Sequence, residues 1–281
     1  MKKINGNGAE IPALGFGTWE LKGGEARNMT KAALDIGYRH IDTAQAYENE
    51  SEVGAGIADS GVDRNDIFVT TKIWRDKFRD GDLQSSLKES LKRLDLDHVD
   101  LTLLHWPVFD VPVEETMGAL NDAREQGLTR HIGLSNYTVA LMKEAVEACP
   151  GPVADNQIEH HVYLDQSPLL DAARNLGLAV TAYSPLGHGG QVFKDNTLTS
   201  IGERYGKSGG QVALRWLVQR GVVAIPRTSS KDHAADNFDI FDFELEPAEI
   251  SAIGNLADPD GRRIDPDWAP DWDEAGSTHR I

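Results

Sequence analysis

Cysteine is almost absent from this chain of 281 residues, in which Cys149 is the single example. An intrachain disulfide framework and a cysteine-based metal cage are therefore both excluded. The first residues, 1–6, are polar and turn-forming and lack the apolar segment of a signal peptide. No apolar run approaches the roughly 18 residues that a membrane span needs. These absences predict a soluble, cytoplasmic protein.

Positive charge is also scarce, with 28 Lys and Arg residues against 45 Asp and Glu residues and a net charge of −17. Nucleic acids and anionic membranes require basic patches, so neither is expected as a partner. One interpretation is the solvated acidic surface of an ordinary soluble enzyme. The other is adaptation to high salt, where carboxylates are screened and keep a protein hydrated. Because the acidic residues are spread along the whole chain, we favour salt adaptation.

The sequence does contain a repeated alternation of short apolar strands and amphipathic helices. Residues 1–14 are expected to form a capping hairpin turned at Asn5-Gly6-Asn7-Gly8. The predicted strands are 14–18, 38–42, 67–72, 99–105, 130–135, 153–157, 179–183 and 222–226. The predicted helices are 25–36, 50–60, 82–94, 114–126, 138–148, 167–176, 208–220, 231–238 and 247–256. Together they predict an α/β fold over residues 1–281, a single-domain (β/α)8 TIM barrel with a hairpin cap, an extra C-terminal helix and a tail from residue 258.

The alternative is an open doubly wound sheet, but no predicted strand is followed by its Gly-x-Gly-x-x-Gly fingerprint. In a parallel barrel the carboxyl ends of the strands meet at one face, where active sites lie. A lone His or Lys at a strand end is more often a bystander, but here nearly every strand ends in polar or aromatic groups. Their convergence predicts an active site. These strand-end residues are Thr18, Trp19, Asp42, Lys72, His105, Ser135, Asn136, Gln157, Tyr183, Ser184, Pro226, Arg227 and Thr228.

Three of these side chains, Asp42, Lys72 and His105, form with Tyr47, in the loop after the strand that ends at Asp42, a unit that can protonate a carbonyl oxygen. A tyrosine has a pKa of about 10, and a lysine ammonium about 4 Å away favours the phenolate by about 4 kcal/mol. Lys72 would thus bring the pKa of Tyr47 toward the range of a general acid. Asp42 would keep Lys72 charged, and a neutral His105 would orient the carbonyl. Something else must attack the carbonyl carbon.

The residues around these positions resemble the aldo-keto reductases in ordered motifs that run from about residue 4 to 264. The motifs are Gly37-Tyr38-Arg39-His40-Ile41-Asp42-Thr43-Ala44 with Tyr47, Thr70-Thr71-Lys72-Ile73-Trp74, Leu103-Leu104-His105-Trp106-Pro107, Ile132-Gly133-Leu134-Ser135-Asn136, Asn156-Gln157-Ile158-Glu159, Ala182-Tyr183-Ser184-Pro185-Leu186-Gly187 and Val223-Ala224-Ile225-Pro226-Arg227. Gly261-Arg262-Arg263-Ile264 is similar to the C-terminal segment of prokaryotic members related to 2,5-diketo-gluconate and methylglyoxal reductases.

The resemblance implies a (β/α)8 barrel that binds extended NADPH and reduces aldehydes and ketones by hydride transfer without a metal. The family's catalytic tetrad falls on Asp42, Tyr47, Lys72 and His105. Thr18, Trp19 and Asp42 are implied to contact the cofactor. The other implied contacts are Ser135, Asn136 and Gln157 at the nicotinamide carboxamide, Tyr183 stacked on the nicotinamide ring, Ser184, Leu186 and Gly187 over the pyrophosphate, Arg227, Thr228, Ser229 and His233 around the 2′-phosphate, and Asn237 at the adenine.

Two departures from the family pattern concern the 2′-phosphate. Arg227 stands where the family usually has lysine, and His233 stands where it usually has arginine. Arginine keeps a cation with a bidentate fork, whereas histidine is largely neutral near pH 7. Asp232 and Asp236 add negative charge nearby. We therefore expect NADPH to be preferred by a smaller margin than is usual, with NADH accepted as well.

The mouth of the pocket is expected to be an apolar funnel for small aldehydes, α-dicarbonyls or keto sugars. Its predicted lining is Trp19, Tyr47, Trp74, His105 and Trp106, although Trp74 or Trp106 could instead belong to the core. The tail at 258–281 is rich in Pro and Asp and is expected to be a disordered acidic end, with Trp268 or Trp272 reaching toward the mouth. His160 and His161 lack companion ligands and are interpreted as structural. A monomer is expected.

Two other functions remain open from the sequence. A Schiff-base aldolase would use Lys72 as its nucleophile. A non-catalytic sensor would bind NADPH without turnover, although the full tetrad and the lack of a partner-binding extension disfavour it.

Overall fold

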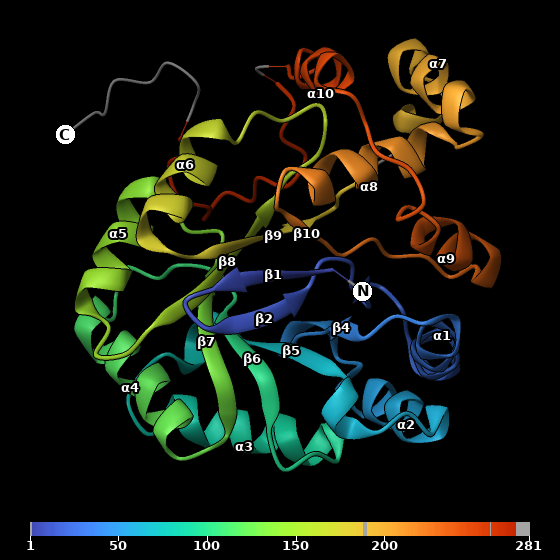
Figure 1. Ribbon diagram of the computed structural model, residues 1–281. Helices are drawn as coiled ribbons and strands as arrows, with labels where there is room; N and C mark the ends of the chain where they lie inside the picture. The colour runs from blue at the N-terminus through green and yellow to red at the C-terminus, as the bar shows by residue number, and fades with distance from the viewer. Residues whose placement is uncertain (1, 188–189, 259, 274–281) are drawn as a thin grey trace.

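The strands form one closed parallel barrel in the computed structural model, which describes residues 2–187, 190–258 and 260–273. The strands neighbour one another in chain order, and the sheet closes where Leu14 pairs in parallel with Ala224. The predicted (β/α)8 barrel is confirmed (Figure 1). Its strands are β3 (Phe16–Gly17), β4 (His40–Asp42), β5 (Phe68–Ile73), β6 (Val99–Leu104), β7 (Thr129–Ser135), β8 (Val153–Glu159), β9 (Ala179–Tyr183) and β10 (Val223–Ala224).

The helices surround the barrel because each has one apolar side that packs on the strands (Figure 1). In α3, for example, Leu83, Leu87, Leu91 and Leu94 are buried at spacings of three and four residues. The predicted helices correspond to α1 (Gly23–Ile36), α2 (Glu50–Ser60), α3 (Asp82–Leu94), α4 (Val113–Glu125), α5 (Val139–Ala148), α6 (Ser167–Leu176), α8 (Gly209–Gln219), α9 (Lys231–Phe238) and α10 (Pro247–Gly254).

One helix, α7 (Asn196–Tyr205), was not predicted. It begins after Asp195, whose side chain accepts hydrogen bonds from the backbone N–H groups of Thr197 and Leu198. Its buried residues are Leu198, Ile201 and Gly202. So few buried residues leave too weak an apolar repeat to separate a helix from a loop in the sequence.

The N-terminal hairpin covers the end of the barrel where the strands begin. It consists of β1 (Lys3–Gly6) and β2 (Ala9–Pro12), joined through Asn7 and Gly8 at φ angles of 44° and 96°. Asn7 donates its backbone N–H to Gly177 O at 2.9 Å and its side-chain amide to Val153 O at 2.7 Å, just before β9 and at the start of β8. The hairpin therefore leaves the opposite end of the barrel free for a site.

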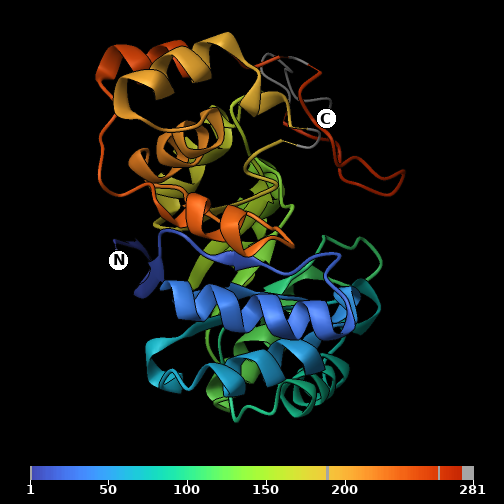
Figure 2. The ribbon, with the colours of Figure 1, turned by 90° about the vertical axis from the view of Figure 1, so that its right-hand side faces the viewer.

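The C-terminal segment lies on the side of the molecule away from this hairpin (Figure 2). The expectation of a disordered tail is wrong for residues 260–273, which we call the strap. The strap is held because the backbone N–H groups of Arg263 and Ile264 donate to the buried Glu159 carboxylate, at 2.9 Å each. Residues 274–281 lie outside the described residues. No helix among the described residues is long and apolar enough to span a membrane.

Candidate active site

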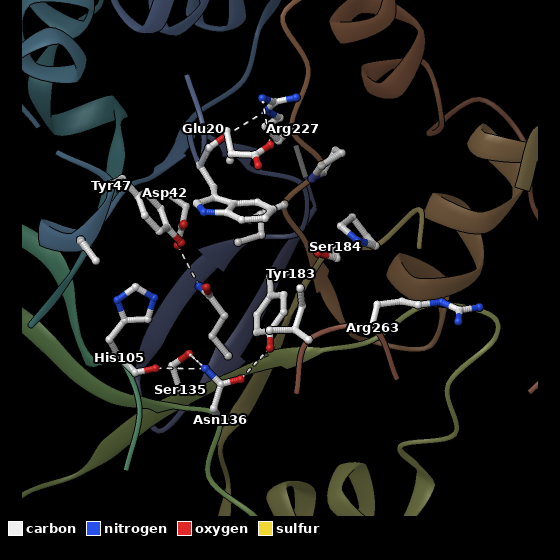
Figure 3. Close-up of a pocket in the computed structure, with 18 of the residues that line it drawn as sticks. Glu20, Asp42, Tyr47, His105, Ser135, Asn136, Tyr183, Ser184, Arg227 and Arg263 are labelled. Carbon is white, nitrogen blue, oxygen red and sulfur yellow. Dashed lines mark hydrogen bonds and ion pairs between the residues drawn. The ribbon is translucent and has the colours of Figure 1, made fainter. Parts of the chain in front are cut away.

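A cavity of about 650 Å³ opens at the carboxyl ends of the strands, and most predicted site residues lie in its wall (Figure 3). Thr18 does not line it. The Thr18 side chain is fully buried and donates to the backbone oxygen of Asp42 at 2.9 Å, so the predicted cofactor contact of this side chain is corrected. The predicted residues in the wall are Trp19, Asp42, Tyr47, Trp74, His105, Trp106, Ser135, Asn136, Gln157, Tyr183, Ser184, Leu186, Gly187 and Arg227.

Tyr47 ends a short 3-10 helix, η1 (Gln45–Tyr47), in the loop that follows β4. The buried amide of Asn49 fixes this loop. Its nitrogen donates to Thr18 O at 2.8 Å and Leu21 O at 2.9 Å, and its oxygen accepts from the Thr43 hydroxyl at 2.8 Å. A fully hydrogen-bonded buried amide of this kind holds the loops after β3 and β4 in one arrangement, which sets the position of the Tyr47 phenol.

Lys72 is fully buried, and its ammonium makes three hydrogen bonds. The acceptors are Asp42 Oδ1 at 2.6 Å, Thr43 O at 2.9 Å and the Tyr47 hydroxyl at 3.1 Å. Burial lowers the pKa of Lys72, but the charge of Asp42 and the contact with Tyr47 more than offset it, so the net pKa is raised. Lys72 is therefore a permanent cation at neutral pH.

The pKa of Tyr47 differs from the sequence expectation. Burial raises it, and this effect outweighs the lowering by Lys72, so the net pKa is above the ordinary value of 10.0. The expectation that Lys72 lowers the pKa of Tyr47 overall is thus corrected. The free-energy cost of removing a phenolate from water is larger than the favourable interaction of the phenolate with the nearby ammonium. Tyr47 remains a protonated phenol at neutral pH, with its oxygen directed at the cavity floor (Figure 3).

His105 stands beside Tyr47 and is uncharged. Burial lowers its pKa well below 6.5, and the charge of Lys72 lowers it further. Its ring contacts Tyr47 and Trp74 edge to face, at centroid distances of 5.6 Å and 5.2 Å. Within the described residues, Nδ1 is buried without a hydrogen-bond partner. A neutral imidazole with its proton on Nε2 could donate one hydrogen bond to an oxygen in the cavity.

A wall of amides and one phenol stands opposite the tetrad. Asn136 donates to His105 O at 3.0 Å and to Ser135 Oγ at 3.1 Å, and its oxygen accepts from the Tyr183 hydroxyl at 2.7 Å. Gln157 donates to Asp42 Oδ2 at 2.8 Å, which links this wall to the tetrad. The hydrogen bonds fix the ring of Tyr183 and leave the Ser135 hydroxyl proton and the Gln157 oxygen for a ligand.

Arg227 lies beside Glu20 in the cavity wall, on the side away from Tyr183 and Asn136 (Figure 3). Its Nε donates to Trp19 O at 2.9 Å, and its guanidinium pairs with Glu20 at 3.2 Å. Four predicted cofactor residues, Thr228, Ser229, His233 and Asn237, are absent from the cavity wall and lie on the segment and helix that follow Arg227.

The strap supplies wall residues that the sequence did not assign. Trp268 lies edge-on to Trp106 and Trp74, at centroid distances of 4.9 Å and 6.1 Å. Trp272 contacts Trp106 at 6.0 Å but is outside the wall, so Trp268 is the tail tryptophan at the mouth. The wall residues that were not predicted include Glu20, Phe193, Arg263, Ile264, Asp265 and Pro266. Glu20 follows Trp19 and the strap residues belong to or follow the Gly261-Arg262-Arg263-Ile264 motif, whereas Phe193 had no signal in the sequence.

A second set of contacts holds the Glu159 carboxylate that anchors the strap. His161 lies 3.1 Å from the Glu159 carboxylate through Nε2, while its Nδ1 accepts from the Tyr163 N–H at 3.3 Å. This pattern requires only one proton on the imidazole, at Nε2. No group of three or more His, Cys, Asp and Glu side chains in the described part of the chain is arranged to hold a metal ion.

Comparisons with known proteins agree with this geometry. Residues 13–258 match the family model described as "Aldo/keto reductase family". Methylglyoxal reductase DkgB of Salmonella typhi is 42% identical over 267 residues, which cover 94% of this chain and 99% of that protein. A crystal structure described as a 2,5-diketo-D-gluconic acid reductase B has 48% identity, coverage of 97% and 98%, and a TM-score of 0.95. The Bombyx mori aldo-keto reductase in complex with NADP has 37% identity, coverage of 94% of each chain, and a TM-score of 0.88.

Proposed function

This chain belongs to the aldo/keto reductase family, and on that premise we propose that it reduces small carbonyl compounds to alcohols with NADPH. The substrates we propose are small aldehydes, α-dicarbonyls such as methylglyoxal, and keto sugars. The observation that carries the proposal is the hydrogen-bonded chain from Asp42 through Lys72 to the Tyr47 phenol, at 2.6 Å and 3.1 Å, at the floor of an aromatic cavity.

Residues along the cavity wall could contact NADPH from its nicotinamide to its phosphate groups. The Ser135 hydroxyl can donate to the carbonyl of the nicotinamide carboxamide, and the Gln157 oxygen can accept from its NH₂ group. Asn136 has used both amide protons within the protein, so one lone pair of its oxygen remains for that ligand. The Tyr183 ring offers a flat face, Gly187 at φ 52° shapes the loop beside it, and Arg227 offers a cation on the side away from Tyr183 (Figure 3). When bound, NADPH supplies the hydride that reduces the carbonyl carbon.

The side chains of this protein supply the proton that the carbonyl oxygen gains. His105 and Tyr47 would hydrogen-bond the carbonyl oxygen and polarise it. Tyr47 then gives its proton to that oxygen as negative charge develops there. The Lys72 ammonium stabilises the phenolate that remains, and Asp42 holds Lys72 in place. The raised pKa of Tyr47 is compatible with this step, because an alkoxide is far more basic than a phenolate.

The aldolase alternative is disfavoured by the state of Lys72. A Schiff-base lysine must be an accessible, neutral amine. Lys72 is fully buried, its three N–H donors are all engaged, and its pKa is raised. The sensor alternative differs from the reductase only in turnover, so activity decides between them.

The test is NADPH consumption at 340 nm with a panel of small carbonyls that includes methylglyoxal. We expect turnover that falls by at least about a hundredfold in Tyr47→Phe while NADPH binding, followed by fluorescence, is retained. Binding without turnover in the wild type would contradict the reductase and support a sensor. Comparable kcat/KM values for NADH and NADPH at pH 8 would support the narrow cofactor preference, and a preference beyond about a thousandfold would contradict it.

A further inference from the structure

Arg227 is already occupied within the protein. Its Nε donates to the backbone oxygen of Trp19 at 2.9 Å, and its guanidinium lies 3.2 Å from the Glu20 carboxylate. Both partners belong to the turn after β3, while Arg227 follows β10, so the contacts span the seam where the barrel closes. Figure 3 shows the two side chains meeting above the cavity. The positive charge offered to an anion there is therefore partly balanced before any ligand arrives.

The other charged groups of the cavity do not replace the positive charge that Glu20 balances on Arg227. Among the described residues, its wall contains two basic side chains, Arg227 and Arg263, against the carboxylates of Glu20, Asp42 and Asp265. Asp42 is balanced by Lys72 at 2.6 Å, but Glu20 and Asp265 remain as acidic groups on the wall. A ligand with two linked phosphates and a third phosphate on its ribose thus meets little net positive charge.

The backbone at Glu20 indicates that this carboxylate is placed by the fold. Glu20 has a φ of 63°, in the left-handed region that non-glycine residues rarely adopt. The neighbouring Trp19 O accepts from Arg227, and Leu21 is fully buried with its N–H donating to Thr18 O at 3.1 Å. The residue is therefore anchored on both sides, and its side chain, 55% exposed, is directed along Arg227.

We propose that Glu20 is a cofactor-selecting residue, because it shares Arg227 with the 2′-phosphate of NADPH and so reduces the preference over NADH. This inference rests on the proposed function and deepens it. NADPH must bring its 2′-phosphate against a guanidinium that a carboxylate already pairs. NADH has two ribose hydroxyls at that place, and it leaves the Glu20–Arg227 pair intact. The Glu20–Arg227 pair therefore weakens the binding of NADPH more than the binding of NADH.

The experiment measures dissociation constants of NADPH and NADH by tryptophan fluorescence quenching without any carbonyl substrate. The variants are Glu20→Gln, which keeps the shape of the side chain, and Glu20→Lys, which reverses its charge. We expect Glu20→Gln to tighten NADPH binding by about fivefold and NADH binding by less than about twofold. Glu20→Lys should increase the preference for NADPH further, measured as the dissociation constant of NADH divided by that of NADPH. Thermal unfolding checks that each variant is folded.

Glu48→Gln is the matched control. Glu48 has a similar backbone, at φ 55°, and it is also ion-paired, to Lys22 at 3.6 Å, but it is absent from the cavity wall. It should change both constants by less than about twofold. Equal tightening of both cofactors by Glu20→Gln would overturn the proposal, because Glu20 would then repel the shared diphosphate. Weaker NADPH binding would also overturn it, because Glu20 would then position Arg227 for the phosphate.

This experiment distinguishes failure of the proposed function from failure of the proposed role of Glu20. If the wild type binds neither NADPH nor NADH, the proposed function fails and the role of Glu20 fails with it. If the wild type binds both and the ratio does not respond to Glu20, only the role of Glu20 is overturned.

Discussion

Asp42 and Lys72 form an ion pair with 2.6 Å between Oδ1 and Nζ, and their side chains are 1% and 0% exposed. The other oxygen of Asp42 accepts from Gln157 at 2.8 Å. One carboxylate therefore touches both the lysine that supports Tyr47 and the wall proposed to hold the nicotinamide. A change in Asp42 should alter the proton supply and the shape of the cofactor site together.

Asp42→Asn should remove the main cause that raises the pKa of Lys72. Burial, which lowers that pKa, would then dominate, and Lys72 would tend to lose its proton. We expect kcat/KM to fall by about a hundredfold at pH 8 and to recover partly as the pH is lowered, because acid restores the ammonium. The measurement is the pH profile of kcat/KM beside Asp97→Asn, a change at an exposed site. A loss that is the same at every pH would contradict this account.

Glu159→Gln should loosen the strap. Glu159 accepts the backbone N–H groups of Arg263 and Ile264, and a glutamine amide nitrogen cannot accept them. Because the strap carries Trp268 to the mouth, we expect KM for the carbonyl to rise about tenfold while kcat stays within about threefold. Trypsin should cleave faster after Arg262 or Arg263. Glu147→Gln, on the exposed side of α5, is the control, and an unchanged KM with unchanged proteolysis would contradict the anchoring role.

Asp155→Asn should stabilise the protein at alkaline pH. Asp155 is fully buried, and burial raises its pKa well above 3.8. Above pH 3.8 the unfolded chain releases this proton while the folded protein keeps it, so each pH unit favours unfolding by about 1.4 kcal/mol up to the folded pKa. Asparagine has no such proton and can still accept from Thr181, which lies 3.0 Å from Asp155.

The gain in unfolding free energy from Asp155→Asn should therefore be small at pH 4.5 and exceed about 1 kcal/mol at pH 8. Urea unfolding at a series of pH values measures it. A gain that does not depend on pH would show that the carboxyl group is ionised in the folded protein.

Salt should stabilise this protein because its net charge is −17. The screening length falls from about 10 Å at 0.1 M salt to about 3 Å at 1 M, which removes most repulsion among surface carboxylates. Surface ion pairs such as Arg174–Asp171 also weaken, but each contributes only about 0 to 1 kcal/mol. We expect the unfolding midpoint and the turnover rate both to rise between dilute buffer and 2 M KCl. A flat or falling midpoint would favour an ordinary acidic surface.

The fold and the position of the site could be predicted from the sequence because they follow from local patterns. Apolar strands and amphipathic helices alternate in register, and in a parallel barrel the strand ends must converge. That rule places Asp42, Lys72 and His105 at one face of the barrel. It could not identify α7, which is held mainly by its Asp195 cap and a few apolar contacts.

Three features depended on the tertiary structure because they involve residues far apart in the chain. The pKa of Tyr47 is raised because burial outweighs the nearby ammonium, and burial is not visible in the sequence. The strap is ordered because Glu159, more than a hundred residues earlier, accepts its backbone N–H groups. Glu20 reaches Arg227 because the first and last strands meet when the barrel closes. The sequence by itself therefore determined which strand-end groups meet at one face, and the closed barrel decided their charge states and their partners, since both depend on distance and desolvation in three dimensions.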